Sequence, residues 1–216
     1  MSVPRLHAVP LVGVLALQGA FREHVEAFTE LGVATRLVKR PMHLEGLDAI
    51  VLPGGESTTQ TKLLDTSELR EPLTSALADG LACFATCAGL ILLAREVIDG
   101  RPDQMPLGVL DIAVQRNGYG RQIESFEAPI AITDIDIAGL DSTGLDTADP
   151  GEWPFPGVFI RAPKIVQTGS VEILGRYNDS PVLVRHGAIW GATFHPELAR
   201  DLRLHRAFLR SPSLLS

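Results

Sequence analysis

The segment Ala82–Ala94, ACFATCAGLILLA, changes character at its middle, and it is the part of the chain that most clearly indicates the fold. Its first half is a short apolar run typical of a buried β-strand, whereas its second half carries leucines at helical spacing. Cys87 stands between the halves, among small residues that permit a sharp turn. The segment therefore predicts a strand, a tight turn that presents a thiol, and a helix.

The same alternation of strand and helix runs through the N-terminal half of the chain. Nearly continuous apolar runs indicate strands covered on both faces, and segments of helical periodicity separate them. This order predicts an α/β fold with three layers, in which helices cover both faces of a mostly parallel central sheet. The expected strands are Leu11–Gly19, Ala34–Arg40, Leu47–Leu52 and Leu81–Thr86, and the expected helices are Phe21–Gly32, Thr58–Ala78 and Ala88–Val97.

The C-terminal half predicts an antiparallel extension of short strands, a surface loop over residues 136–157 and a last helix near Leu198–Leu209. The stretch Pro181–Phe194 is typical of a hairpin that turns at His186-Gly187. With no repeat or break in composition, residues 1–216 are expected to form one domain with its core at about 11–210. The expected strands lie in Leu107–Asn117, Ala128–Asp136, Gly157–Pro163, Val171–Tyr177, Pro181–Gly187 and Ala188–Phe194.

Composition narrows the functional classes. The net charge of −7 disfavours nucleic acid or an anionic membrane as the main partner. No apolar run reaches the roughly 18 residues of a membrane helix, and the N-terminal apolar stretch is better interpreted as a core strand than as a leader. Two cysteines are too few for a disulfide framework, so we expect a reducing, cytoplasmic setting.

Cys87 is the first candidate for chemistry. A nucleophile on a strand-to-helix turn is exposed above the sheet, the helix N-terminus favours a thiolate, and the next backbone N–H, that of Ala88, can face an oxyanion. The alternative is a buried structural cysteine, which suits Cys83 inside the strand better. A metal site at these cysteines is not expected, because no further ligand stands at suitable spacing.

A thiol nucleophile needs a base with an orienting partner, and FHPEL (194–198) offers both. In an extended segment, residues two apart point to the same side, so Glu197 can lie beside the His195 ring. The alternative is a simple turn into the last helix. The other five histidines are expected at the surface or the terminus: His7, His24, His43, His186 and His205.

LPGGESTT (52–59) lets backbone N–H groups approach a ligand closely after a buried strand. It is an oxyanion donor or only a tight turn, and it lacks the lysine and spacing of a P-loop. Gln18, this turn and Cys87 all fall at the C-terminal ends of expected strands, so they are expected at one rim of the sheet, where α/β folds bind ligands.

Together these elements resemble the class I glutamine amidotransferases, which are glutaminases with a Cys–His–Glu triad. The chain is most similar to the glutaminase subunits of pyridoxal 5'-phosphate synthases, from about Val12 to Leu209. General amidotransferases lack two of the motifs, RNGYGRQIESFE and FIRAP. The motifs that carry the resemblance are LALQGAFREH (15–24), VLPGGESTT (51–59), TCAGLILLA (86–94), RNGYGRQIESFE (116–127), VFIRAP (158–163) and FHPEL (194–198).

The resemblance implies a role for each matching residue. Cys87 is the nucleophile, His195 the base and acid, and Glu197 its orienting partner. Gly55 and Ala88 supply the oxyanion N–H groups. Glutamine is held by Gly55, Glu56, Ser57, Arg116, Ile160 and Arg161, with Gln18 organising glutamine or the partner-dependent active state. An arginine suits this task, because its planar guanidinium grips a carboxylate through two hydrogen bonds.

The implied reaction is hydrolysis of L-glutamine to L-glutamate and ammonia, without metal or organic cofactor. The implied partner is the (β/α)₈ synthase subunit, which uses the ammonia to make pyridoxal 5'-phosphate. The alternatives are a glutaminase that serves another synthase and a non-catalytic scaffolding subunit. Two features depart from the family pattern: Ala85 replaces a usual glycine, and the loop Asp141–Pro156 is longer than usual.

Overall fold

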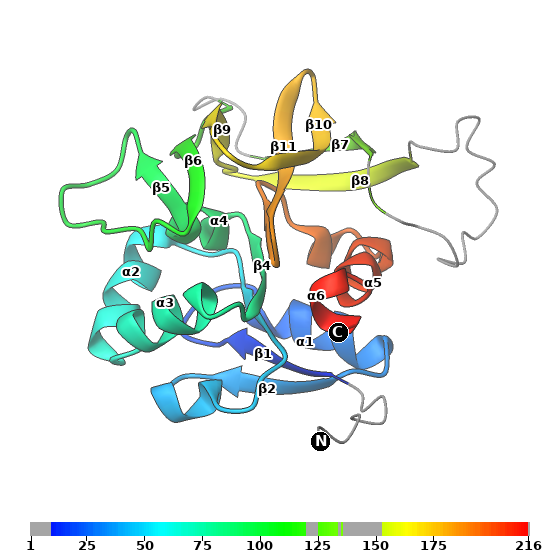
Figure 1. Ribbon diagram of the computed structural model, residues 1–216. Helices are drawn as coiled ribbons and strands as arrows, with labels where there is room; N and C mark the ends of the chain where they lie inside the picture. The colour runs from blue at the N-terminus through cyan, green and yellow to red at the C-terminus, as the bar shows by residue number, and fades with distance from the viewer. Residues whose placement is uncertain (1–9, 120–124, 134, 136–152, 216) are drawn as a thin grey trace.

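The computed structural model describes residues 10–119, 125–133, 135 and 153–215, and it is built around a nine-stranded sheet (Figure 1). The first five strands of this sheet pair in parallel and the last four extend it antiparallel, which confirms the predicted α/β fold. In sheet order the strands are β2 (Ala34–Val38), β1 (Leu11–Leu15), β3 (Ala49–Leu52), β4 (Ala82–Thr86), β12 (Ile189–Ala192), β11 (Ser180–His186), β10 (Glu172–Tyr177), β7 (Ser125–Ile132) and β8 (Trp153–Ile160).

Helices cover both faces of the parallel strands, because side chains alternate along each buried strand. On β3, Ala49 and Val51 join a core cluster with α1 and α5, whereas Ile50 and Leu52 join a second cluster with α2, α3 and α4. Figure 1 shows these two groups of helices on opposite sides of β4. The helices are α1 (Phe21–Glu30), α2 (Ser57–Thr66), α3 (Arg70–Ala78), α4 (Ala88–Leu93), α5 (Arg203–Leu209) and α6 (Pro212–Leu215), with 3₁₀ turns η1 (Pro41–Leu44) and η2 (Pro196–Leu198).

A second sheet of three strands adds to the side of the core covered by α2 and α3. It consists of β5 (Ala94–Val97), β6 (Leu110–Gln115) and β9 (Lys164–Thr168). Ile112 and Ile165 bury their side chains in the second cluster, and this packing fixes the small sheet. The prediction that the helix after Cys87 extends to Val97 is therefore wrong, because β5 pairs with β6 from Ala94 onward.

Other element boundaries also differ from the predictions. The single helix expected over Thr58–Ala78 is divided into α2 and α3, because Glu68 adopts a φ of 60° that no α-helix accommodates. The helix expected near Leu198–Leu209 begins only at Arg203, as α5, and the further helix α6 follows it. Trp153–Gly157 belongs to β8 and not to the predicted loop, whose residues 136–152 lie outside the described residues. The hairpin at His186-Gly187 is confirmed by the pairing of β11 with β12.

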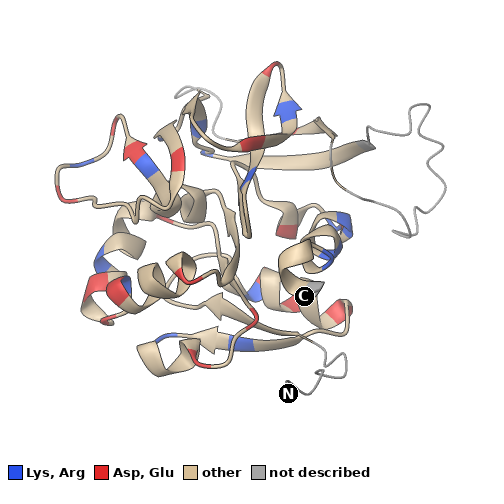
Figure 2. Cartoon of the chain, viewed as in Figure 1, with Lys and Arg blue, Asp and Glu red and all other residues tan. Residues whose placement is uncertain are grey.

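Charged residues of both signs are interspersed over the outer elements in Figure 2, which suits the modest net charge. Within the described part of the chain, no helix combines the length and the apolar character needed to cross a membrane.

Candidate active site

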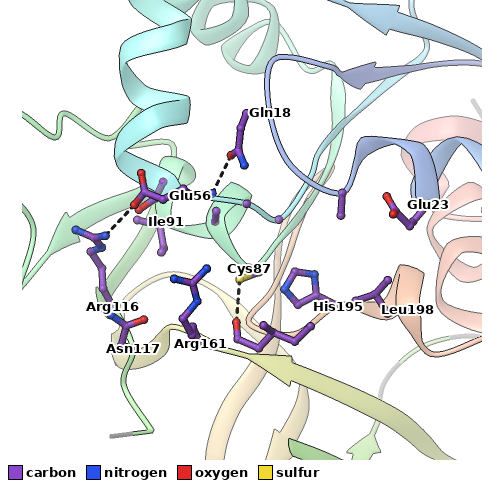
Figure 3. A pocket seen from close by; sticks show the side chains of 16 residues that line it. Gln18, Glu23, Glu56, Cys87, Ile91, Arg116, Asn117, Arg161, His195 and Leu198 are labelled. Carbon is purple, nitrogen blue, oxygen red and sulfur yellow. Dashed lines mark hydrogen bonds and ion pairs between the residues drawn. The ribbon is translucent and has the colours of Figure 1, made fainter. Parts of the chain in front are cut away.

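Four neighbouring parallel strands bring the predicted functional residues to one rim of the sheet. In the order β1, β3, β4 and β12, their C-terminal ends lead to Gln18, the Gly54–Ser57 turn, Cys87 and His195. Figure 3 shows these side chains around one pocket. The parallel sheet thus brings together residues as far apart in the chain as positions 18 and 195. They lie at the rim where α/β folds bind ligands.

Cys87 occupies a sharp turn between β4 and α4. Its φ of 48° is in the left-handed region that non-glycine residues rarely adopt, and it serves as the N-terminal cap residue of α4. Gly89 makes the turn possible, since a Cβ there would lie 2.0 Å from the carbonyl oxygen of Leu52. The Cys87 side chain is nearly buried, and its Sγ lies 3.9 Å from the carbonyl oxygen of Ile160. The turn holds the sulfur at the floor of the pocket.

His195 faces the same pocket and pairs with Glu197. Its Nδ1 lies 2.7 Å from Oε1 of Glu197, whose side chain is fully buried. Pro196 begins the 3₁₀ turn η2, so the expected turn and the expected His–Glu contact occur together. The backbone N–H of His195 also donates to the carbonyl of Val158 in β8, at 2.8 Å. Both the ring and the backbone of His195 are therefore fixed.

Electrostatics in this cluster favour a protonated His195. Burial lowers the pKa of His195, but hydrogen bonds and electrostatic interactions with Cys87 and Glu197 outweigh burial and raise it to about 10. Burial raises the pKa of Glu197, but the His24 and His195 rings that face it hold the pKa below its ordinary value. An imidazolium between a sulfur and a carboxylate is a proton donor poised for a leaving group.

This raised pKa predicts a pH-dependent stability. Because the folded-state pKa of about 10 exceeds the ordinary 6.5, protonated His195 stabilises the fold fully below pH 6.5, and this contribution is lost as the pH rises toward 10. At about 1.4 kcal/mol per pKa unit, the loss amounts to a few kcal/mol. Urea unfolding of wild type and His195→Gln at several pH values measures it. The difference between the two proteins should shrink between pH 6.5 and 10, and a constant difference would contradict the prediction.

The turn after β3 is held by the segment after β1. The backbone N–H of Glu56 donates to Oε1 of Gln18 at 2.8 Å, and Ala20 N–H donates to the Gly54 carbonyl at 3.0 Å. Gln60 Nε2 donates to the backbone carbonyls of Gln18 and Pro53, both at 3.1 Å. The side chain of Gln18 is therefore used in holding the Gly54–Ser57 turn.

A second polar group lies at the far side of the pocket. Arg116 directs Nη2 to Glu56 Oε1 at 3.1 Å and Nη1 to Gln104 Oε1 at 3.3 Å, while Gln104 Nε2 donates to Ser57 Oγ at 2.9 Å. Burial raises the pKa of Glu56, but hydrogen bonds from Thr58 and Thr59 outweigh it and lower the pKa to about 2. The pocket therefore presents a fixed anion beside a fixed cation at neutral pH.

The pocket itself measures about 330 Å³. Three of the seven non-glycine residues with positive φ in the described chain line it, namely Cys87, Asn117 and Arg161, and such strained backbone is concentrated at functional sites. Glu197 lies behind His195. The other predicted site residues all line the pocket: Gln18, Gly55, Glu56, Ser57, Cys87, Ala88, Arg116, Ile160, Arg161 and His195.

Several residues at or behind the pocket were missed by the sequence analysis. Gly54 lies against both His195 and Cys87, and Asn117 lines the pocket beside Arg116. Both belong to motifs that the sequence analysis quoted, but roles were assigned only to neighbouring residues of those motifs.

The prediction that His24 and His205 lie at the surface is wrong, since both are fully buried behind the pocket. His24 shares the inner face of α1 with Ala27 and Phe28, at the helical spacing of three and four residues. That periodicity was the signal in the sequence. Of the remaining histidines, His186 is exposed, His43 is partly buried, and His7 lies outside the described residues.

The site combines a thiol on a strained strand–helix turn with a His–Glu pair at the rim of a parallel sheet. This arrangement fits the class of cysteine-dependent α/β hydrolases and amidotransferases. The family model of the SNO glutamine amidotransferase family matches residues 14–213. The chain belongs to this family. Among the described residues, no group of three or more histidine, cysteine or acidic side chains is arranged to hold a metal ion.

Individual relatives give the same result. The chain is 51% identical to the pyridoxal 5'-phosphate synthase subunit PdxT of Thermotoga neapolitana, over 92% of this chain and 97% of that protein. It is 48% identical to the subunit of the same name from Parafrankia sp., over 94% and 93% of the two chains. A crystal structure of a glutamine amidotransferase superposes with a TM-score of 0.79 at 48% identity, covering 92% of this chain and 96% of that one.

Proposed function

We propose that this protein is the glutaminase subunit of a pyridoxal 5'-phosphate synthase, with Cys87, His195 and Glu197 as its catalytic triad. Relatives at 51% and 48% identity carry the name of that synthase subunit. The observation that carries the catalytic assignment is the placement of Cys87, on a strained turn, in the same pocket as His195, which pairs with Glu197.

The proposed reaction takes place in two halves. The Cys87 thiolate attacks the side-chain amide carbon of glutamine, and the backbone N–H groups of Gly55 and Ala88 stabilise the oxyanion. Protonated His195 gives its proton to the departing amide nitrogen, which leaves as ammonia, so a thioester remains on Cys87. His195 then takes a proton from water, and the hydroxide cleaves the thioester to glutamate. Glu197 orients the His195 ring throughout.

The charged groups of the pocket suit an amino acid zwitterion. Arg116 and Arg161 are cations for the α-carboxylate, and Glu56 is an anion for the α-ammonium group. Ser57 and the backbone at Ile160 complete the enclosure, and Gln18 holds the turn that bears Gly55. We place the protein in the cytoplasm, since both of its cysteines are free thiols and a thiol nucleophile must stay reduced.

We infer that the partner is the (β/α)₈ synthase subunit, because ammonia released to solvent would be protonated and lost. Glutamate release should therefore increase at least about tenfold when the synthase subunit is added, within the usual range of coupling between sites.

A second experiment tests direct transfer of ammonia. The complex is supplied with [amide-¹⁵N]glutamine together with excess unlabelled ammonium. Label retained in the pyridine ring of pyridoxal 5'-phosphate would support direct transfer. Equal turnover with and without the synthase, or full dilution of the label, would reject this partner.

A further inference from the structure

Two fully buried histidines, His24 in α1 and His205 in α5, meet behind the active site and have no part in the proposed triad. His24 Nδ1 lies 3.1 Å from His205 Nε2, and the two residues are 181 positions apart in the chain. Buried polar groups are costly unless they are paired, so a histidine pair at the junction of two helices needs a reason.

The other nitrogen of His24 faces the triad carboxylate. His24 Nε2 lies 3.4 Å from Glu197 Oε2, while Glu197 Oε1 is engaged by His195. Within the described residues, Glu197 Oε2 has no hydrogen bond at normal distance. A fully buried carboxylate oxygen needs a positive or hydrogen-bearing neighbour, and His24 supplies it.

His24 also contacts the residue that anchors the oxyanion turn. Its Nε2 lies 3.1 Å from Thr86 Oγ1, and that hydroxyl accepts a hydrogen bond from Gly54 N–H at 3.1 Å. Thr86 directly precedes Cys87 at the end of β4. One imidazole therefore touches both the support of the base and the support of the turn that carries Gly55.

The network also fixes where the protons lie. A proton on His24 Nε2 faces Glu197 and Thr86, so Nδ1 accepts from His205 Nε2–H. The remaining nitrogen, His205 Nδ1, has no partner among the described residues and is then the unprotonated one. Burial lowers the pKa of His24 and lowers that of His205 to about 3, which disfavours a charged ring at both positions. The other ionisable groups acting on His24 are Glu197, His195 and Glu23.

We propose that His24 is a positioning residue for the reaction, which holds the second oxygen of Glu197 and, through Thr86, the Gly54–Gly55 turn. This inference deepens the proposed function and rests on it. It differs from a purely structural role in one respect: removal of the Nε2–H group should impair the chemistry more than the loss of stability explains.

The test compares three variants in the complex with the synthase subunit. His24→Leu should lower kcat for glutamine hydrolysis about 10- to 100-fold with KM within about twofold, because misplacing the base affects the chemical step. His24→Gln should recover most of kcat, since its amide N–H group can take the place of Nε2–H. The matched control is Phe28→Leu, which weakens the same buried face of α1; the Phe28 ring packs edge-on against His205 but has no polar atom to offer Glu197.

A second readout does not depend on glutamine. In a Cys83→Ala background, the rate of Cys87 alkylation by iodoacetamide is measured against pH. His24→Leu should move the midpoint of this profile by about half a pH unit or more, because thiol reactivity follows its charged neighbours and the charged neighbour His195 is held through Glu197. Phe28→Leu should leave the profile in place.

The outcomes separate this inference from the proposed function. Equal loss of kcat in His24→Leu and Phe28→Leu, or no recovery in His24→Gln, would overturn the positioning role. An unchanged alkylation profile in His24→Leu would overturn it as well. If wild type hydrolyses no glutamine while the alkylation profile moves as expected, the glutaminase proposal fails and the positioning of His195 by His24 stands.

Discussion

Cys87→Ala should lower glutamate release by at least about a thousandfold while leaving the fold intact, because removal of a covalent nucleophile leaves only the catalysis from binding and the oxyanion site. The change removes one sulfur atom from a nearly buried position, and alanine fits the surrounding small residues. Glutamate release is measured by coupled assay with the synthase subunit present. The loss should lie in kcat, since Cys87 is proposed to supply the nucleophile of the chemical step and not a group that binds the amino acid.

The chain offers a matched control in Cys83. That cysteine lies inside β4, four residues before Cys87, and burial in apolar surroundings raises the pKa of its thiol. Cys83→Ala should therefore keep wild-type turnover. Full activity in Cys87→Ala would reject the proposed mechanism. Ammonium supplied to the Cys87→Ala complex should restore formation of pyridoxal 5'-phosphate, which locates the defect in the glutaminase step.

The parallel half of the fold could be predicted because its inner strands are buried on both faces, whereas the edge strand β2 is partly exposed. Apolar runs such as Leu11–Leu15 and Ala49–Leu52 have little choice of environment, so local pattern and tertiary position agree. Prediction from the sequence failed where the secondary structure of a segment depends on its pairing or packing with distant parts of the chain. Ala94–Val97 follows a leucine-rich helix and becomes a strand only because β6 pairs with it. The helix break at Glu68 is also tied to tertiary packing, because the next residue, Leu69, is buried in the second cluster.

The site shows the same division. Cys87, His195 and Glu197 could be singled out, because each stands in a short motif whose geometry is local. The contacts behind them could not, since His24 meets Glu197 and His205 only after β4, α1 and α5 have packed together. General surface statistics placed these histidines outside. Their helical spacing relative to neighbouring apolar residues indicated the buried face of each helix, and the structure places them on that face.

Gly54 was also overlooked, and it gives the second large expected effect. A Cβ at this position would lie 2.3 Å from Cε1 and 2.9 Å from Nδ1 of His195, and 3.3 Å from Cβ of Cys87. The His195 ring cannot yield easily, because Glu197 holds its Nδ1 at 2.7 Å and Val158 holds its backbone. Gly54→Ala should therefore displace the ring from the sulfur.

A displacement of about 1 Å between base and nucleophile costs on the order of a hundredfold in rate, so kcat of Gly54→Ala should fall by about that factor. The control is Gly175→Ala in β10, where the nearest atom to a new Cβ is Leu183 Cβ at 3.1 Å, far from the pocket. Its kcat should stay near wild type. Steady-state kinetics of both variants with the synthase subunit, alongside their melting temperatures, separates misplacement of His195 from general destabilisation. Wild-type kcat in Gly54→Ala would mean that the ring is not confined between Gly54 and Glu197, and the proposed role of His195 would lose its geometric basis.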